Sequence, residues 1–274
     1  MKFFLSALLM MTCPLALPAS DDIFFDSAWL GLSVLDFDYE EFDDRGISLD
    51  RERGLLPGLN AGVNAQRGEW LFETRLLWLS GNVDYTSATA ASRTDEDILN
   101  LELTTGYRIQ TTKEQQFYLV AGAGYRKWWR NIHSTATASG LDETYDWSYG
   151  LLGLRGEQTL NNQTQLVADL QLTRTINPGI NVHFISNFND VSLNLQEETG
   201  YRFRLTLNRQ VGESTSFWVA PWYEYWKLGR SNNTALYSNQ IQIGSVFEPR
   251  SETRNFGINL GVRWRFGNNS SAQF

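Results

Sequence analysis

Two short segments carry the side chains best suited to catalysis in this chain. Both have the form Asn-Val-X and end in a possible general base: Asn82-Val83-Asp84 and Asn181-Val182-His183. An aspartate carboxylate or a histidine imidazole can act as a general base when it lies within hydrogen-bond reach of the proton it removes. Asp84 and His183 are the candidate catalytic residues, and the resemblance described below gives the reaction that they would share.

A run of carboxylates near the start of the chain is a second group of interest. Asp36, Asp38 and Glu40 alternate with other residues and so share one face of an extended strand. Clustered carboxylates suit a hard cation such as Ca²⁺, although a solvated acidic rim is the favoured interpretation. We therefore assign no metal ligands, and because no nucleotide-binding loop is present we expect no cofactor.

The segment 255–266 indicates the kind of element that must position these residues. Every second residue in it is apolar, and the residues between are glycine, asparagine or arginine. A strand with this pattern has one apolar and one polar face. The sequence offers no continuous apolar strands or helices to cover the apolar face. Lipid accepts such a face, and a strand meets lipid only as part of a closed barrel.

The same alternation recurs along the chain and predicts ten strands. Their ranges are 27–41, 54–66, 69–82, 99–109, 117–126, 142–157, 165–173, 201–208, 213–229 and 255–266. Short turns are predicted at 67–68, 110–114, 158–162 and 210–213. Long loops are predicted at 42–53, 83–96, 131–141, 175–197 and 230–252. Because outer-membrane barrels have short periplasmic turns and long outward loops, we predict an all-β fold, a ten-stranded antiparallel transmembrane β-barrel.

The polar face of these strands carries charges of both signs. The predicted inward set is Glu73, Arg75, Glu102, Arg108, Arg126, Arg155, Glu157, Asp169, Arg202, Arg204, Glu224, Arg263 and Arg265. Such charges are costly in lipid, whereas in a polar lumen opposite signs can pair. We expect this set to fill the interior of the barrel, and a narrow polar pore is the alternative.

The segment 255–266 also resembles the C-terminal assembly signal of Gram-negative outer-membrane barrels. That signal has the form polar-x-Gly-x-x-aromatic-x-aromatic, and the matching residues here are Asn259, Gly261, Trp264 and Phe266. In that family the signal usually ends the chain, whereas residues 267–274 follow it here. The resemblance implies a location in the outer membrane, contact with lipid and lipopolysaccharide, and recognition by the barrel assembly machinery.

The ten-strand plan resembles that of the omptin family of outer-membrane proteases. Those proteases carry an Asp-x-Asp pair in the second outer loop and an Asp-x-His pair in the fourth, and the pairs activate a water molecule between them. Asp84 and His183 match the second member of each pair, whereas Asn82 and Asn181 stand in place of the first aspartates. Since Asn cannot act as a general base, proteolysis is an alternative here and not the leading hypothesis.

Charge and the N-terminal segment further limit the class of protein. The formal net charge of -8 argues against nucleic acid as a partner. Lys2, an apolar run and a small-residue exit are typical of a secretory signal peptide, so we predict a signal peptide at 1–20 and the barrel at 21–274.

The favoured function is non-catalytic, either interaction through the surface loops or an envelope scaffold. The alternatives are an omptin-like endopeptidase and a narrow small-solute channel, and the sequence identifies no surface ligand.

Overall fold

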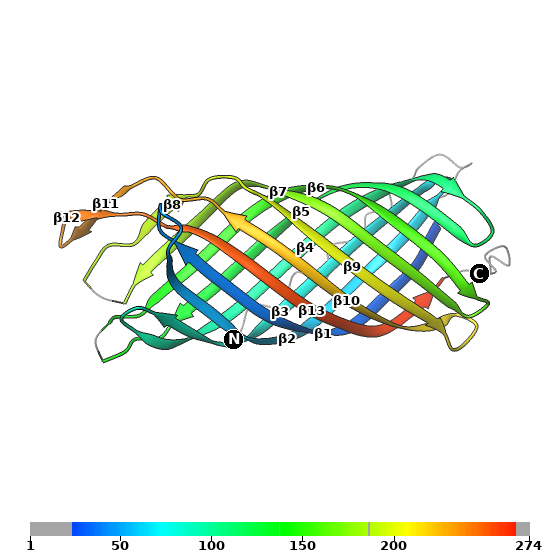
Figure 1. The fold of residues 1–274 in the computed structure, drawn as a ribbon, viewed down its shortest axis with the longest axis horizontal. Coiled ribbons are helices and arrows are strands. Elements are labelled where there is room, and N and C mark those ends of the chain that lie inside the picture. Colours follow the sequence, from blue (N-terminus) through cyan, green and yellow to red (C-terminus); the bar gives the residue numbers. More distant parts are fainter. Residues whose placement is uncertain (1–23, 137, 186, 267–274) are drawn as a thin grey trace.

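The computed structural model describes residues 24–266 apart from 137 and 186, and it consists of strands joined by turns and loops (Figure 1). Ten strands are long: β1 (Phe24–Phe42), β2 (Ser48–Arg67), β3 (Trp70–Ser87), β4 (Ala91–Thr111), β5 (Gln115–Ile132), β6 (Leu141–Asn161), β7 (Thr164–Phe184), β9 (Thr199–Gln210), β10 (Thr215–Leu228) and β13 (Arg250–Arg265). Three are short: β8 (Val191–Asn194), β11 (Thr234–Ser238) and β12 (Ile241–Val246). Within the described part of the chain, no helix is long and apolar enough to cross a membrane. The predicted signal peptide lies outside the described residues.

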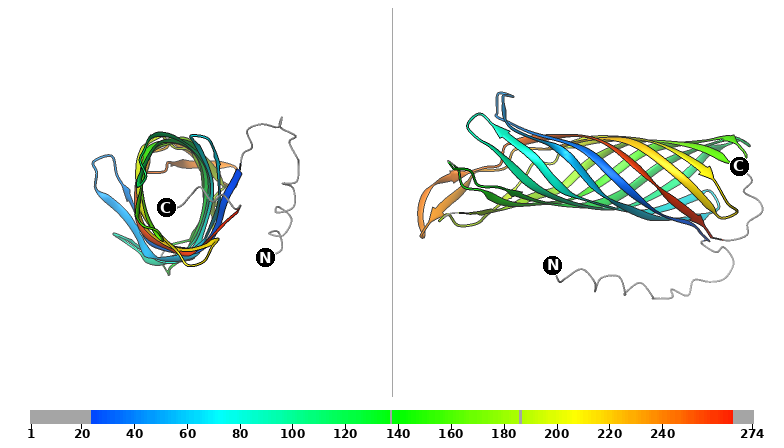
Figure 2. Two further views of the ribbon diagram at one scale, coloured as in Figure 1. Left: turned by 90° about the vertical axis from the view of Figure 1, so that its right-hand side faces the viewer. Right: turned by 90° about the horizontal axis from the view of Figure 1, so that it is seen from below.

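The ten long strands form one closed antiparallel barrel, which confirms the predicted fold. Each long strand pairs with the next along the chain, and β13 pairs back with β1 through partners such as Ser27 and Arg265. Figure 2 shows the resulting ring from one end. The short strand β8 extends the wall beside β7, and the β11–β12 hairpin projects beyond the barrel at the end with the long loops.

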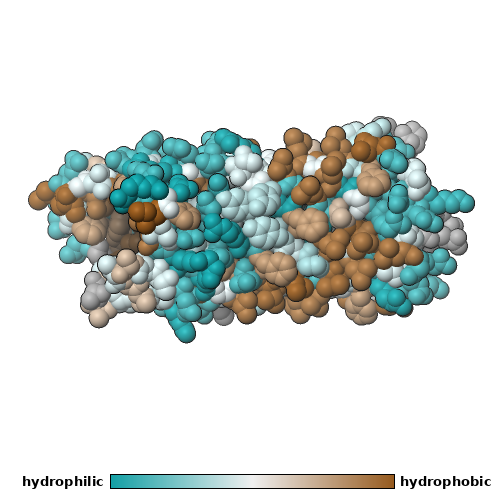
Figure 3. All heavy atoms as spheres, in the orientation of Figure 1, coloured by the Kyte–Doolittle hydropathy of each residue, from teal (hydrophilic) through white to brown (hydrophobic). Residues whose placement is uncertain are grey.

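An apolar belt covers the outer face of the barrel, from about its middle to near the end with the short turns (Figure 3). Outward-facing members include Leu30, Leu32, Phe72, Leu76, Leu101, Leu103, Leu152, Leu154, Leu170, Leu172, Ile258 and Leu260. Exposed aromatic residues stand toward its margins, among them Trp70, Tyr107 and Trp264 on one side and Trp78, Tyr125 and Tyr201 on the other. A belt with aromatic margins is the lipid-facing surface of a transmembrane barrel, and short turns mark its periplasmic end.

The strands continue well past the belt, further than the sequence pattern predicts. The predicted loop at 83–96 contains only residues 88–90 outside strands, and pairing between β3 and β4 runs to Thr86 and Ala91. Beyond Trp78 the outer face meets water, and the hydrophobic phase inverts: Leu79 and Val83 face inward and are buried, while Asp84 is exposed. An extracellular extension of the barrel therefore replaces most of the predicted loops.

A hydrophobic core fills the part of the barrel inside this extension. Trp128 stacks on Tyr145 with ring centroids 4.9 Å apart, and Tyr149 meets the edge of Trp226 at 5.0 Å. Aliphatic side chains from other strands pack around these rings, among them Leu35, Leu56, Leu79, Ile98, Ile180 and Val182. The barrel thus has lipid outside its periplasmic half and a protein core inside its outer half.

Candidate functional site

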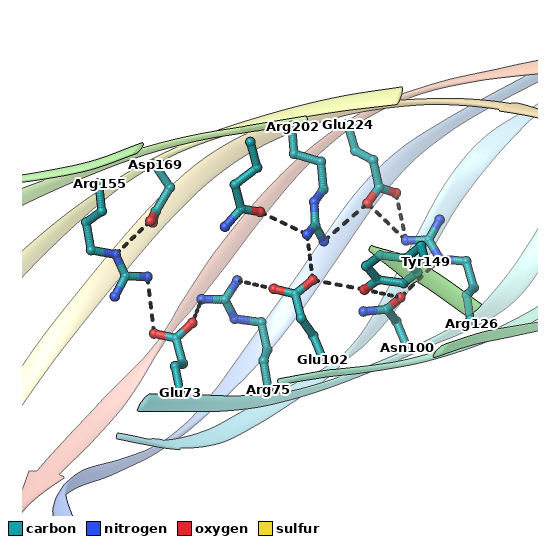
Figure 4. Close-up of polar contacts among 11 residues, drawn as sticks. Glu73, Arg75, Asn100, Glu102, Arg126, Tyr149, Arg155, Asp169, Arg202 and Glu224 are labelled. Atoms are coloured by element: carbon teal, nitrogen blue, oxygen red, sulfur yellow. Dashed lines mark hydrogen bonds and ion pairs between the residues drawn. The ribbon is translucent and has the colours of Figure 1, made fainter. Parts of the chain in front are cut away.

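A network of ion pairs crosses the lumen at the level of the belt (Figure 4). The guanidinium of Arg126 on β5 donates to both carboxylate oxygens of Glu224 on β10, at 2.7 and 3.0 Å. Glu102 on β4 accepts hydrogen bonds from Arg202 on β9 and, at 2.9 Å, from the hydroxyl of Tyr149. Charge-assisted hydrogen bonds of this kind fix both partners strongly. The network therefore ties opposite walls of the barrel together.

The network continues toward the periplasmic end. Arg155 on β6 donates to Asp169 at 2.7 Å and to Glu73 on β3 at 3.3 Å, and Arg75 also pairs with Glu73. These residues belong to the inward set predicted from the sequence, and the structure confirms that they face the lumen. Pairing neutralises most of the charge that burial would otherwise make costly.

A second cluster of charges lies above the belt, within the extracellular extension. Its centre is Arg130 on β5, which is almost fully buried and has carboxylates on several sides. The four carboxylates, with nitrogen–oxygen distances, are Glu143 at 2.7 Å, Glu52 at 3.0 Å, Glu96 at 3.6 Å and Glu41 at 3.8 Å. The guanidinium also lies over the ring of Tyr39, 4.5 Å from its centroid. We call Arg130 and these four glutamates the outer cluster.

The outer cluster has more carboxylates than its one arginine can neutralise. Burial raises the pKa values of Glu41, Glu96 and Glu143, and neighbouring carboxylates raise them further against the opposing effect of Arg130. Burial likewise raises the pKa of nearby Asp50 to about 6 and that of Glu248 to about 8. Some of these groups therefore hold a proton at neutral pH, which reduces the mutual repulsion.

The raised pKa of Glu248 predicts a pH-dependent stability. In the folded barrel the carboxyl keeps its proton up to about pH 8, whereas the unfolded chain loses it near the ordinary value of 4.5. The folded state therefore binds more protons between these values, and stability must fall as pH rises through this window. We expect the denaturant midpoint of the refolded protein to decrease from pH 5 to pH 8. Glu248→Gln should make this decrease smaller, and an unchanged slope in that variant would contradict the assignment.

The structure places Asp84 and His183 on the outer surface of the extension. Their neighbours Val83 and Val182 face the interior, whereas the side chains of Asp84 and His183 are 79% and 59% exposed. Asp84 is on β3 and His183 on β7, and three strands lie between them in the wall. Asp84 lies 3.8 Å from Arg93, and His183 Nδ1 lies 2.7 Å from Asp190. Each candidate residue thus contacts its own hairpin, and the two do not face one another.

The predicted acidic run also lies on the outer surface, above the belt. Asp38 accepts from Arg51 and Arg53, at 2.7 and 2.9 Å, and Arg254 donates to Glu40 at 3.1 Å. Arginines on neighbouring strands therefore neutralise these carboxylates, as a bound cation would. Within the described residues no group of three or more His, Cys, Asp or Glu side chains is arranged to hold a metal ion.

Comparisons with known proteins agree with the barrel. The chain belongs to the outer membrane protein beta-barrel domain family, whose model matches residues 5–203, and it is an outer-membrane protein. Among solved structures, that of the outer membrane protease OmpT from Escherichia coli is similar with a TM-score of 0.68 and 11% identity, over 91% of this chain and 99% of that one. At this identity the likeness shows the fold alone.

Two other barrels match less well. The translocator domain of the autotransporter NalP from Neisseria meningitidis has a TM-score of 0.44 and 10% identity, over 88% of this chain and 89% of that one. The outer membrane protein OprG from Pseudomonas aeruginosa has a TM-score of 0.41 and 11% identity, over 90% of this chain and 99% of that one. Curated protein sequences gave no significant match.

The outer cluster was not predicted from the sequence. Of its members, Glu52 and Glu96 fell in predicted loops, and Arg130 lay beyond a predicted strand end. The signal that identifies them is the inversion of the hydrophobic phase. In β1, for example, Leu32 and Val34 are exposed, whereas Leu35 and Phe37 are buried. The residues at every second position after Phe37 must therefore also face inward.

Proposed function

We propose that this protein is a closed, non-catalytic outer-membrane barrel that presents its extracellular extension for surface interaction or envelope integrity. One observation carries the proposal: the interior is packed at two levels, by the ion-pair network at the belt and by the aromatic core and outer cluster above it. A packed interior suits a rigid support and leaves little room for a solute to pass.

The β11–β12 hairpin supports a role in surface interaction. Ile241 and Ile243 on this hairpin are exposed although they stand outside the lipid belt. Apolar side chains grouped at the tip of a projecting element are typical of contact with another molecule. The hairpin is therefore the part of the extension that we assign to such contact.

The channel alternative predicts a conductance, and our proposal predicts none. We expect purified protein in planar lipid bilayers to give no steady ion current, because Arg126, Glu224 and the rings above them occupy the lumen. An open porin inserted into the same bilayers serves as the positive control. A stable ohmic current that appears with each insertion of this protein would overturn the proposal in favour of the channel.

The protease alternative predicts cleavage that depends on His183. We expect no detectable hydrolysis of peptides with paired basic residues, with or without lipopolysaccharide. The reasons are that Asp84 and His183 point outward from separate hairpins and that Asn82 and Asn181 are not general bases. The natural protein is compared with His183→Ala on the same peptides. Cleavage by the first and not by the second would establish the protease function.

A further inference from the structure

The lumen contains a cavity at its periplasmic end, below the ion pairs of Arg155. Its volume is about 510 Å³, and inward-facing side chains from most of the barrel strands line it. The lining includes seven arginine and lysine side chains against four aspartate and glutamate side chains. This end of the interior is therefore cationic, in contrast to the outer cluster, where carboxylates are in excess.

The carboxylates that line the cavity form ion pairs with only some of the lining arginines. Asp169 and Glu73 are bound by Arg155 and Arg75, and Glu157 accepts a hydrogen bond from Gln165 at 3.0 Å. Two of the lining arginines, Arg204 and Arg263, are left over. Across residues 24–266, leaving aside 137 and 186, neither has a carboxylate within 4.0 Å of its guanidinium. The guanidinium of Arg263 lies over the ring of Trp29, 5.5 Å from the centroid.

A third lining residue also has unused hydrogen-bonding groups. Asn208 on β9 is only 4% exposed, and neither its amide nitrogen nor its oxygen has a hydrogen-bond partner in the protein. The Nε atom of Arg263 is likewise buried without an acceptor. Buried donors without acceptors are costly, so their presence around a cavity points to an acceptor inside it.

The strand register brings these donors to one side of the cavity. Asn208 is opposite Trp218, and Trp218 is opposite Gly261, two residues before Arg263 on β13. Asn208 on β9 and Arg263 on β13 therefore flank β10 and are offset by one inward-facing position along the strand direction. Arg204 lies on the same face of β9 as Asn208, four residues away.

We propose that this cavity binds a small oxyanion of the phosphate class from the periplasmic side. Guanidinium groups form paired hydrogen bonds with phosphate oxygens, and the amide of Asn208 adds a neutral donor. The bound anion neutralises Arg204 and Arg263 and accepts from the donors that the protein leaves unused. The site is separate from the exposed triplets and from the extracellular hairpin. The phosphate-binding proposal is therefore independent of the proposed function.

The test is a calorimetric titration of the full-length refolded barrel with inorganic phosphate, in a zwitterionic detergent at low ionic strength. We expect saturable binding by the natural protein. Arg204→Gln and Arg263→Gln each remove one charge-assisted interaction and should weaken binding about tenfold or more. Asn208→Asp keeps nearly the same side-chain shape and adds a negative charge, so it should abolish phosphate binding. This variant keeps the test decisive if an arginine variant fails to fold. Arg53→Gln, which changes an exposed arginine on the outer wall, is the matched control and should bind normally.

Two results would overturn the proposal. One is the absence of saturable phosphate binding by the natural protein, and the other is equal binding by the cavity variants and the Arg53→Gln control. Repeating the titration in phosphatidylcholine vesicles with added phosphatidylglycerol distinguishes a free anion from a lipid headgroup. Undiminished phosphate binding supports the free anion, and loss of binding assigns the same oxyanion site to the headgroup phosphate.

Discussion

We expect Arg130→Met to lower the free energy of unfolding by about 3–5 kcal/mol, the cost of removing one partner from a buried ion pair. The change keeps an unbranched side chain of similar length, so the loss comes mainly from charge. Without the guanidinium, Glu52 and Glu143 lose their nearest cation while they remain buried inside the extension. The effect is measured as the shift in the urea or guanidinium midpoint of the protein refolded in lipid or detergent.

Arg53→Met provides the matched comparison for Arg130→Met. Arg53 also pairs with a carboxylate, Asp38, but its side chain is 60% exposed, and pairs of this kind contribute about 0–1 kcal/mol. Adding Glu52→Gln to Arg130→Met should recover part of the lost stability, because it removes one of the stranded charges. Equal midpoints for the Arg130 and Arg53 variants would show that the outer cluster does not depend on its arginine.

We expect Leu260→Arg to destabilise the barrel by about 2–4 kcal/mol, the cost of a cation near the middle of a lipid-facing surface. Leu260 lies on β13 near the centre of the apolar belt and is 51% exposed. Exposure in this belt means contact with lipid tails, where a guanidinium loses its hydration. The readouts are the folded fraction, from the mobility shift on heating in detergent, and the denaturant midpoint in lipid vesicles.

Ile243→Arg separates lipid from water as the cause. Ile243 on β12 has the same exposed fraction, 51%, but stands on the extracellular hairpin. An arginine there meets water, so its effect on stability should stay within about 0.5 kcal/mol, as for ordinary surface substitutions. If both variants were equally stable, the apolar belt would not be the membrane-facing surface.

The alternation of apolar and polar residues was enough to predict the fold. In the periplasmic half, lipid outside and charge inside produce a simple period of two, as in 255–266. The ten strands, the closed antiparallel barrel and the inward direction of Glu102, Arg126 and Glu224 were all predicted from it and are confirmed.

The same reasoning placed the outer ends of the strands wrongly, for a physical reason. Above the belt the solvent outside the barrel changes from lipid to water, and the interior changes from ion pairs to a hydrophobic core. Asp95, for example, faces outward from a paired strand, although the lipid-based pattern assigned it to a loop, and Lys127 faces outward just beyond a predicted strand end. Backbone pairing does not depend on which solvent lies outside, so the strands continue.

The candidate site was predictable only in part. The two triplets were identified by residue type, but Asp84 and His183 were assigned to loops, so the outward direction of their side chains was not predicted. The outer cluster and the periplasmic cavity are assembled from strands far apart in the sequence. Their composition follows from the barrel register, which no single segment reveals.

The inversion of the hydrophobic pattern along strands such as β3 has a consequence for how the barrel tolerates insertions. A single extra residue between Trp78 and Leu79 would keep one half of β3 in place and turn the other half over, placing Leu79 and Val83 outside and Asp84 within. Two extra residues would restore both faces. Insertions and deletions of an even number of residues at this boundary should therefore leave the barrel folded, and those of an odd number should destabilise it. The boundary thus restricts changes in strand length to even numbers of residues.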